Sequence, residues 1–366
     1  MTSFISSSDM KKLLFKIFLL CLSVLIINVI IKQFITLPVT WGFERLDSKY
    51  NHFTENLEKY NTLMIGSSRL YRQVNVGTFD SINNRSGIDT KTFNFGVHTM
   101  SAADTYRFLD ALSDSLENGD LDNVFIELMN TNHVSVKNLG TIRSTFWYDK
   151  ESVVFGVRSI LNSNRSTINK IYGSISHLLS YSLEFTNAGY ISNYLEYQTI
   201  DTKSEKYQYY LGPYQSGYFP LMDEMIDPTT DEADRSVLKA RYEDFLRDTS
   251  SATTYKNISI ESYSDQSYDS FNQYHYNYLE GIISKLESKG IRVFILFPPR
   301  QTKENYMELI PILNQFPEEQ VISVSSGIEY PELYLAKYSF DFGHLNNEGS
   351  ELFTREISRK FRKKIK

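Results

Sequence analysis

A nearly uninterrupted apolar run from Leu13 to Ile31 constrains this chain more than any other feature. Its length is that of a helix crossing a bilayer, which takes about 20 apolar residues. The lysines that flank it are Lys11, Lys12, Lys16 and Lys32. Positive charge concentrated before a span keeps the N-terminus in the cytoplasm. We therefore expect residues 1–12 to form a cytoplasmic tail and residues 13–34 a single transmembrane helix.

Two other interpretations of this run are weaker. A cleaved secretory signal has small residues at its cleavage site, whereas the sequence after the run, IIKQFITLP, is bulky. A lipid anchor on Cys21 is disfavoured because Leu20 stands where a small residue is expected. We expect a single-pass protein of the inner (cytoplasmic) membrane, with its C-terminal part outside the cytoplasm. Asn28, a polar residue of the span, is expected to be tolerated rather than functional.

Length, charge and cysteine content narrow the class of protein. A chain of 366 residues fits one large domain with insertions, or two domains. The net charge of -6, with RKFRKKIK at the C-terminus as the single basic patch, argues against a nucleic-acid partner. One cysteine excludes a disulfide scaffold. We find no metal-ligand cluster and no phosphate-cradling glycine loop, so no cofactor is expected.

Short apolar runs alternate with segments of helical spacing. The expected strands are NTLMIGSS (61–68), KTFNFGVHTM (91–100), LDNVFIELMN (121–130) and IRVFILFPP (291–299), with EQVISVSS (319–326) as a fifth candidate. The expected helices are 43–60, 101–116 with Ser101 as N-cap, 230–248, 267–290 ending at Gly290, and 346–364. This alternation predicts an α/β fold with a mostly parallel sheet.

Residues 133–262 differ from the flanking segments, because they are rich in Tyr, Ser and Asn and carry no clear repeat. We interpret them as a partly helical insertion or cap of unknown role. The core is then expected in two parts, residues 35–132 and residues 263–366. The aromatic segment YQYYLGPYQSGYF either stacks on sugar rings or packs locally.

Polar residues follow three of the expected strands. They are Gly66-Ser67-Ser68, Asn94-Phe95-Gly96 and Met129-Asn130. In a parallel sheet the carboxyl ends of the strands meet at one edge, and ligands bind in the crevice there. The three loops are therefore expected to converge on one site.

A serine nucleophile needs a base, and the base needs a partner that orients it. Among six histidines, His344 has a suggestive setting, because Asp341 precedes it by three residues in SFDFGHLNNEG. A bent loop brings that carboxylate to one ring nitrogen and leaves the other facing outward. Simpler alternatives stay open: the serines are ordinary turn residues, Asp341 only stabilises a turn, and Asn346 or Asn347 caps the last helix.

The blocks IGSSR, NFGV and DFGHLNNEG resemble those of the SGNH (GDSL-like) hydrolase superfamily. The resemblance covers residues 60–132 and 265–366, and the last block is the most specific. Ser67 stands where that family usually has aspartate, and the family's Gly-x-Asn-Asp block is missing from IELMNTNH. The chain looks like membrane-anchored members that act on cell-surface polysaccharides as O-acyltransferases or esterases. The resemblance implies a three-layer, flavodoxin-like parallel sheet.

By position, the resemblance implies that Ser68 is the nucleophile, His344 the base and Asp341 the orienting acid. The rival α/β-hydrolase elbow needs Gly-x-Ser-x-Gly, and here its last position is Leu70.

An oxyanion hole is also implied, formed by the backbone N–H groups of Ser68 and Gly96. Asn130 is the first candidate for the third donor and Asn132 the second. Loss of one such donor costs on the order of a hundredfold in rate. The alternative to an oxyanion role for Gly96 is a structural one, in which the glycine allows a tight turn.

Arg69 and Arg300 follow strand ends and are candidates for substrate binding, with plain exposure as the alternative. The expected function is serine-dependent hydrolysis or O-acyl transfer, through an acyl-enzyme on Ser68. The substrate would be an acylated cell-surface or exported glycan, or another ester. A membrane-bound O-acyltransferase or another glycan-assembly protein is a candidate partner. The alternatives are a catalytically weak or inactive glycan-binding or assembly component, and a membrane-tethered scaffold.

Overall fold

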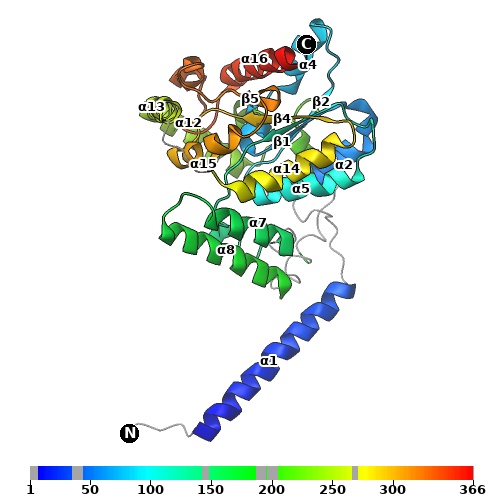
Figure 1. Cartoon of the computed structure of the whole chain (residues 1–366), viewed down its shortest axis with the longest axis vertical. Coiled ribbons are helices and arrows are strands. Elements are labelled where there is room, and N and C mark those ends of the chain that lie inside the picture. Colours follow the sequence, from blue (N-terminus) through cyan, green and yellow to red (C-terminus); the bar gives the residue numbers. More distant parts are fainter. Residues whose placement is uncertain are drawn as a thin grey trace.

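The centre of the molecule is a parallel sheet of five strands (Figure 1). The structure is a computed structural model, and it describes residues 7–34, 44–141, 148–186, 195, 205–265 and 271–365. The strands are β1 Thr62–Gly66, β2 Thr92–Gly96, β3 Asn123–Glu127, β4 Arg292–Phe297 and β5 Val321–Ser323. Their order is β2-β1-β3-β4-β5, and every pairing is parallel. The α/β class and all five expected strands are confirmed.

Helices cover both faces of the sheet because alternate strand residues point into two separate cores. Leu63 and Ile65 of β1 join one core, and Met64 joins the other. The helices of the first core are α2 Glu44–Glu55, α5 Ala102–Ser115, α14 Gln273–Glu287 and α15 Lys303–Leu313. Those of the second are α3 Ser68–Gln73, α4 Val76–Arg85 and α16 Asn347–Lys364. Every residue of β1, β2 and β3 is buried, and so is β4 after Arg292, which explains their apolar runs.

The helix ends follow local chemistry. Ser101 caps α5 in a reciprocal capping box with Asp104, as expected. Asn346 accepts the Gly349 N–H at 3.0 Å and so caps α16. Gly290, at φ 80°, takes the left-handed conformation after α14. Arg362, Lys363 and Lys364 of the basic C-terminal segment form the last turn of α16, as expected for a helix end.

The N-terminal helix α1, Ser7–Phe34, stands apart from the sheet domain (Figure 1). Its stretch Met10–Ile30 is long and apolar enough to cross a membrane, with mean hydropathy 2.7 and no burial within the protein. The orientation of this helix and the identity of the membrane stay predictions. Residues 1–6 of the expected cytoplasmic tail lie outside the described residues.

Several helices lie between β3 and β4 in the chain. They are α7 Lys150–Leu161, α8 Thr167–Phe185, α10 Glu205–Gln208, α11 Leu221–Ile226, α12 Glu232–Arg247 and α13 Ser250–Ser264. The expected helix 230–248 is confirmed as α12, while the boundaries of the proposed insertion stay predictions. In Figure 1, α7 and α8 lie between the sheet domain and α1. The aromatic segment contributes to packing, because Tyr207, Tyr210 and Tyr218 are buried.

Candidate active site

The strand order creates a crevice at one position of the sheet. β1 lies between β2 and β3, so the connection from β1 to β2 and the connection from β2 to β3 run in opposite directions across the sheet. In such sheets ligands bind at this reversal, beyond the carboxyl ends of the strands. Ser67 and Ser68 follow β1 here, and Glu127 ends β3. A cavity of about 310 Å³ lies at this point and is lined by all three residues.

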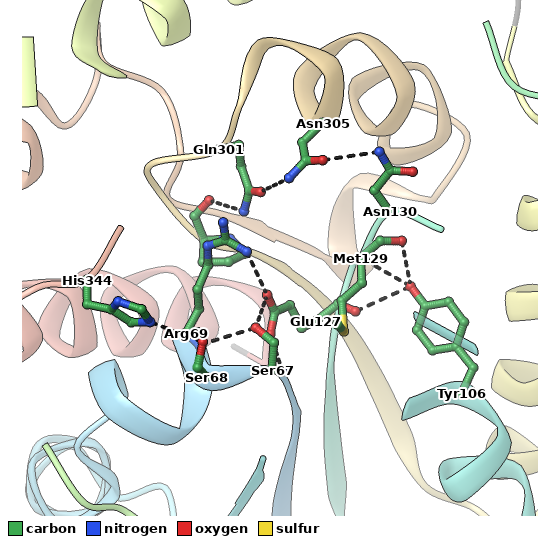
Figure 2. A network of polar contacts seen from close by, with 11 residues as sticks. Ser67, Ser68, Arg69, Tyr106, Glu127, Met129, Asn130, Gln301, Asn305 and His344 are labelled. Carbon is green, nitrogen blue, oxygen red and sulfur yellow. Dashed lines mark hydrogen bonds and ion pairs between the residues drawn. The ribbon is translucent and has the colours of Figure 1, made fainter. Parts of the chain in front are cut away.

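The predicted serine, histidine and aspartate meet at this crevice although they come from opposite ends of the core. Ser68 Oγ lies 3.1 Å from His344 Nε2 (Figure 2). On the other side of the ring, His344 Nδ1 lies 3.0 Å from Asp341 Oδ1. This is the order of contacts in which a carboxylate orients an imidazole and the imidazole takes a proton from a hydroxyl.

A tight turn holds Asp341 in place. Its Oδ1 accepts the backbone N–H groups of Gly343 and His344, each at 2.8 Å, and Arg241 of α12 bonds to Oδ2. Burial by itself would raise the pKa of the Asp341 carboxyl. The hydrogen bond from His344 and the charges of His344 and Arg241 outweigh burial and hold that pKa well below its usual range. Asp341 is therefore a carboxylate at neutral pH.

Ser67 is held by a buried carboxyl group, and this distinguishes it from Ser68. Glu127 Oε2 accepts the Ser67 N–H at 2.6 Å, and Oε1 accepts its hydroxyl at 2.9 Å (Figure 2). The Arg69 guanidinium lies 3.9 Å from Glu127 Oε1. Burial raises the pKa of Glu127, although Arg69 and the Ser67 bonds oppose the shift. Of the two serines, Ser68 is the one whose hydroxyl contacts the histidine.

From the sequence, Glu127 was assigned no role. The available signal was a glutamate at the end of a buried apolar strand, because an acidic group there needs hydrogen-bond partners. In the fold, those partners are the backbone and hydroxyl of Ser67.

The Ser68 N–H lies in the first turn of α3, and no residue in the described part of the chain accepts a hydrogen bond from it. Gly96, the expected second oxyanion donor, has a different role. Its N–H donates to Asn94 Oδ1 at 2.9 Å, and its carbonyl accepts Lys49 Nζ at 2.6 Å. A Cβ on Gly96 would lie 2.3 Å from the Tyr71 nitrogen. The expectation is corrected: Gly96 is a packing position where β2 meets α3.

The loop after β2 reaches the serine at Thr99. This residue lines the cavity beside Ser68 and has a left-handed backbone, with φ 62°. Such a conformation is strained for a non-glycine residue and is concentrated at functional sites. From the sequence, Thr99 was given no role, because nothing in a sequence indicates that a threonine adopts a left-handed backbone conformation.

Asn130, the expected third donor, also lines the 310 Å³ cavity. Its side-chain amide donates to Asn305 Oδ1 at 3.1 Å, and Asn305 in turn donates to Gln301 (Figure 2). Asn132 lines the same cavity, and its Oδ1 accepts a hydrogen bond from Arg165 at 2.9 Å. A donor role for either asparagine stays a prediction.

The two candidate arginines differ in position. Arg69 lines the cavity beside Ser68. Arg300 is 1% exposed and donates to the Leu333 carbonyl, the Ser339 hydroxyl at 2.6 Å and the Asp341 carbonyl. Burial lowers its pKa to about 10. Arg300 is therefore not a substrate-binding residue; it supports the loop that carries Asp341.

A second cavity, of about 320 Å³, shares the lining residues Ser68 and Thr99 with the first. His344 lines it together with the arginines Arg45, Arg72 and Arg241 and the apolar side chains Leu221, Val237 and Leu238. Helices α11 and α12 thus form part of its wall. Ser68 and Thr99 thus line both cavities.

Among the described residues, no group of three or more His, Cys, Asp or Glu side chains has the arrangement of a metal site. Comparison of the chain with protein-family models and with curated proteins found no match. The site brings a serine hydroxyl into contact with a histidine, and that histidine into contact with a carboxylate. This is the arrangement that acyl transfer through a serine requires.

Proposed function

We propose that this protein is a membrane-anchored serine esterase or O-acyltransferase of SGNH type that acts on an acylated cell-surface or exported glycan. The observation that carries the proposal is the contact series from Ser68 through His344 to Asp341 at the crevice of a parallel sheet. The exclusion of Ser67 from this series by Glu127 supports Ser68 as the nucleophile.

The reaction proceeds in two halves. Ser68 Oγ attacks the ester carbonyl while His344 Nε2 takes the hydroxyl proton, and the alcohol leaves with that proton. The acyl group is then bound as an ester to Ser68. Water or a sugar hydroxyl attacks this ester, gives its proton to His344 and releases the acid or the new ester, while the proton returns to Ser68. Asp341 keeps the ring oriented and stabilises its charge.

The two cavities favour acyl transfer to a hydroxyl. Because Ser68 lines both cavities, an acyl donor in one and an acceptor sugar in the other would each lie beside this residue. Hydrolysis would need only one of the two cavities, because water is then the acceptor. A membrane-bound O-acyltransferase is the proposed partner that supplies the acyl group.

The proposed location is the inner membrane, with α1 as a single span and the sheet domain outside the cytoplasm. The apolar stretch of α1 and the lysines before it support this orientation. A reporter that is active only in the cytoplasm, fused after residue 40, is expected to be inactive. Activity of that reporter would contradict export.

A fluorophosphonate probe on the full chain in detergent tests the enzyme. We expect covalent labelling that Ser68→Ala abolishes and Ser67→Ala retains, with circular dichroism showing that both variants fold. Hydrolysis of an aryl acetate is expected to follow the same pattern. Labelling that survives Ser68→Ala would contradict the assignment.

A catalytically weak or inactive glycan-binding component is a second candidate. It is favoured by the hydrogen bonds that engage the Gly96 N–H and the Asn130 amide, since these were the expected oxyanion donors. It predicts glycan binding by a folded protein that the fluorophosphonate does not label.

A further inference from the structure

One face of α8 is apolar and exposed. The residues on it are Ile168, Ile171, Tyr172, Ile175, Leu178, Leu179 and Phe185, each between 45% and 77% exposed. From Ile168 to Leu179 they recur at spacings of three and four residues, and Phe185 follows Leu178 by seven, so all lie along one side of the helix. Contiguous apolar surface of this kind marks a site of interaction. We call this set the α8 apolar face.

The orientation of the helix is set by its opposite face, which packs on α7. Gly173 lies against the Ile160 side chain, and His177 lies against Gly156 so closely that a Cβ there would be 2.3 Å from the ring. Ser180 is fully buried on the same side. Rotation of α8 about its axis would break these contacts, so the apolar face is held outward.

The α8 apolar face lies on the side of the molecule where α1 emerges. The Asn28 amide of α1 donates to the Thr186 carbonyl at the end of α8, at 2.8 Å. Asn28 is near the end of the apolar stretch Met10–Ile30, where a membrane span would reach the lipid surface. In Figure 1, α8 lies beyond α7 as seen from the sheet and crosses the direction of α1.

We propose that α8 lies in the outer surface of the bilayer that α1 crosses, with its apolar face among the lipids. An amphipathic helix lying in the plane of a membrane buries one apolar face in this way. The inference rests on the proposed anchoring of α1. Lipid is the occupant because the contact between Asn28 and Thr186 brings α8 to the level where the span ends.

The proposed contact would act on the active site through the inner side of α8. His177 Nε2 lies 2.8 Å from the Asn132 carbonyl, and Ser176 Oγ accepts the Val134 N–H at 2.9 Å. His177, Asn132 and Val134 all line the 310 Å³ cavity that Ser68 shares. Seating α8 in lipid would therefore hold this cavity at the membrane surface, where a membrane-bound donor or lipid-linked glycan is available.

Nitroxide labels on the full chain test the proposal in vesicles of phosphatidylcholine and phosphatidylglycerol. One label is placed at Ile175→Cys in a Cys21→Ala background. The matched control is Ile328→Cys, because Ile328 is 59% exposed and Ile175 is 57% exposed. A third sample carries its label on the native Cys21 of α1. Collision rates with oxygen, which concentrates in lipid, and with a water-soluble nickel chelate are measured by electron paramagnetic resonance.

The label at position 175 is expected to collide readily with oxygen and several-fold less than the Ile328→Cys label with the nickel chelate. Leu178→Cys is expected to repeat this pattern. If the label on Cys21 is in lipid but the label at position 175 collides with the nickel chelate as often as the control label, the inference about α8 is wrong. The proposed membrane anchoring by α1 would remain supported. Shielding of position 175 from both reagents would mean a protein partner or second copy and would overturn the lipid contact. A water-exposed label on Cys21 would overturn the anchor and the inference together.

Discussion

Arg241 of α12 forms an ion pair with Oδ2 of Asp341, the carboxylate whose Oδ1 contacts His344. The arginine comes from the helical region between β3 and β4, and the aspartate from the turn before α16. The Arg241 side chain is 38% exposed, whereas Asp341 is almost completely buried. The position of α12 is therefore coupled to the geometry of the proposed catalytic series.

Arg241→Ala is expected to lower kcat by up to about fivefold, because an ion pair with one partly exposed member contributes about 0–1 kcal/mol. Arg241→Lys should retain part of the rate. Arg247→Ala is the matched control, since Arg247 lies on the same helix and is exposed. Hydrolysis of an aryl acetate at saturating substrate measures the effect. An unchanged rate in Arg241→Ala would show that the turn holds Asp341 without help.

Glu127→Gln is expected to change how stability depends on pH. Because the pKa of Glu127 is raised above its ordinary value of 4.5, the folded protein keeps this proton after the unfolded chain has released it. Stability therefore falls as pH rises from the unfolded pKa to the raised one, by at most about 1.4 kcal/mol per pH unit. Glutamine cannot titrate, so the variant should lose this decline.

Thermal unfolding of the full chain from acidic to neutral pH measures the difference. Glu117→Gln is the control, because Glu117 is exposed. Parallel stability curves for the wild type and Glu127→Gln would mean that the carboxyl is ionised throughout and would contradict the raised pKa.

Gly96→Ala is expected to destabilise the protein by about 2 kcal/mol or more. The added Cβ would lie 2.3 Å from the Tyr71 backbone, and neither β2 nor α3 can move without disturbing the core. Gly281→Ala is the matched control: Gly281 lies in α14 with open space around its Cβ position, so this change should stabilise by about 0.5–1 kcal/mol. Denaturant unfolding checks both. If Gly96→Ala had normal stability but low activity, the result would contradict the packing role and support Gly96 as an oxyanion donor.

Arg300→Ala and Arg69→Ala should separate a structural from a substrate-binding arginine. Removal of Arg300 leaves the Leu333 and Asp341 carbonyls without their donor, and charged hydrogen bonds contribute about 1.5–3 kcal/mol each. A clear fall in melting temperature is expected. Arg69→Ala is expected to raise KM for the glycan substrate with a smaller change in stability. The reverse pattern would contradict both roles.

Local pattern was sufficient for much of the fold. The strands at 62–66 and 123–127 were predictable because a strand buried on both faces carries a nearly continuous apolar run. The cap at Ser101 was predictable because it depends on neighbours three residues away. The order of the strands was not, since parallel pairing joins segments far apart in the chain and leaves no local signal.

The candidate site, like the fold, was predictable only in part from local sequence. Asp341 and His344 lie in one turn, so their contact could be predicted from their spacing in the sequence. The resemblance to a family pattern indicated Ser68. The meeting of Ser68 with His344 depends on the sheet, which brings residues 276 positions apart to 3.1 Å. Gly96 and Arg300 were assigned to the site because glycine and arginine are common residue types in such sites. In the fold, Gly96 is packed against α3, and Arg300 is buried under the turn that carries Asp341.

The sequence by itself determined the elements that local periodicity and capping control: an apolar N-terminal helix, five buried strands, and a serine and an Asp-His pair at loop positions. Only the tertiary structure decided which polar groups each of these meets. It joined Ser67 to Glu127, Asp341 to Arg241 and α8 to the end of α1. The physical reason is that a hydrogen bond or ion pair depends on distance in space, and distance between remote segments is set by how the cores pack.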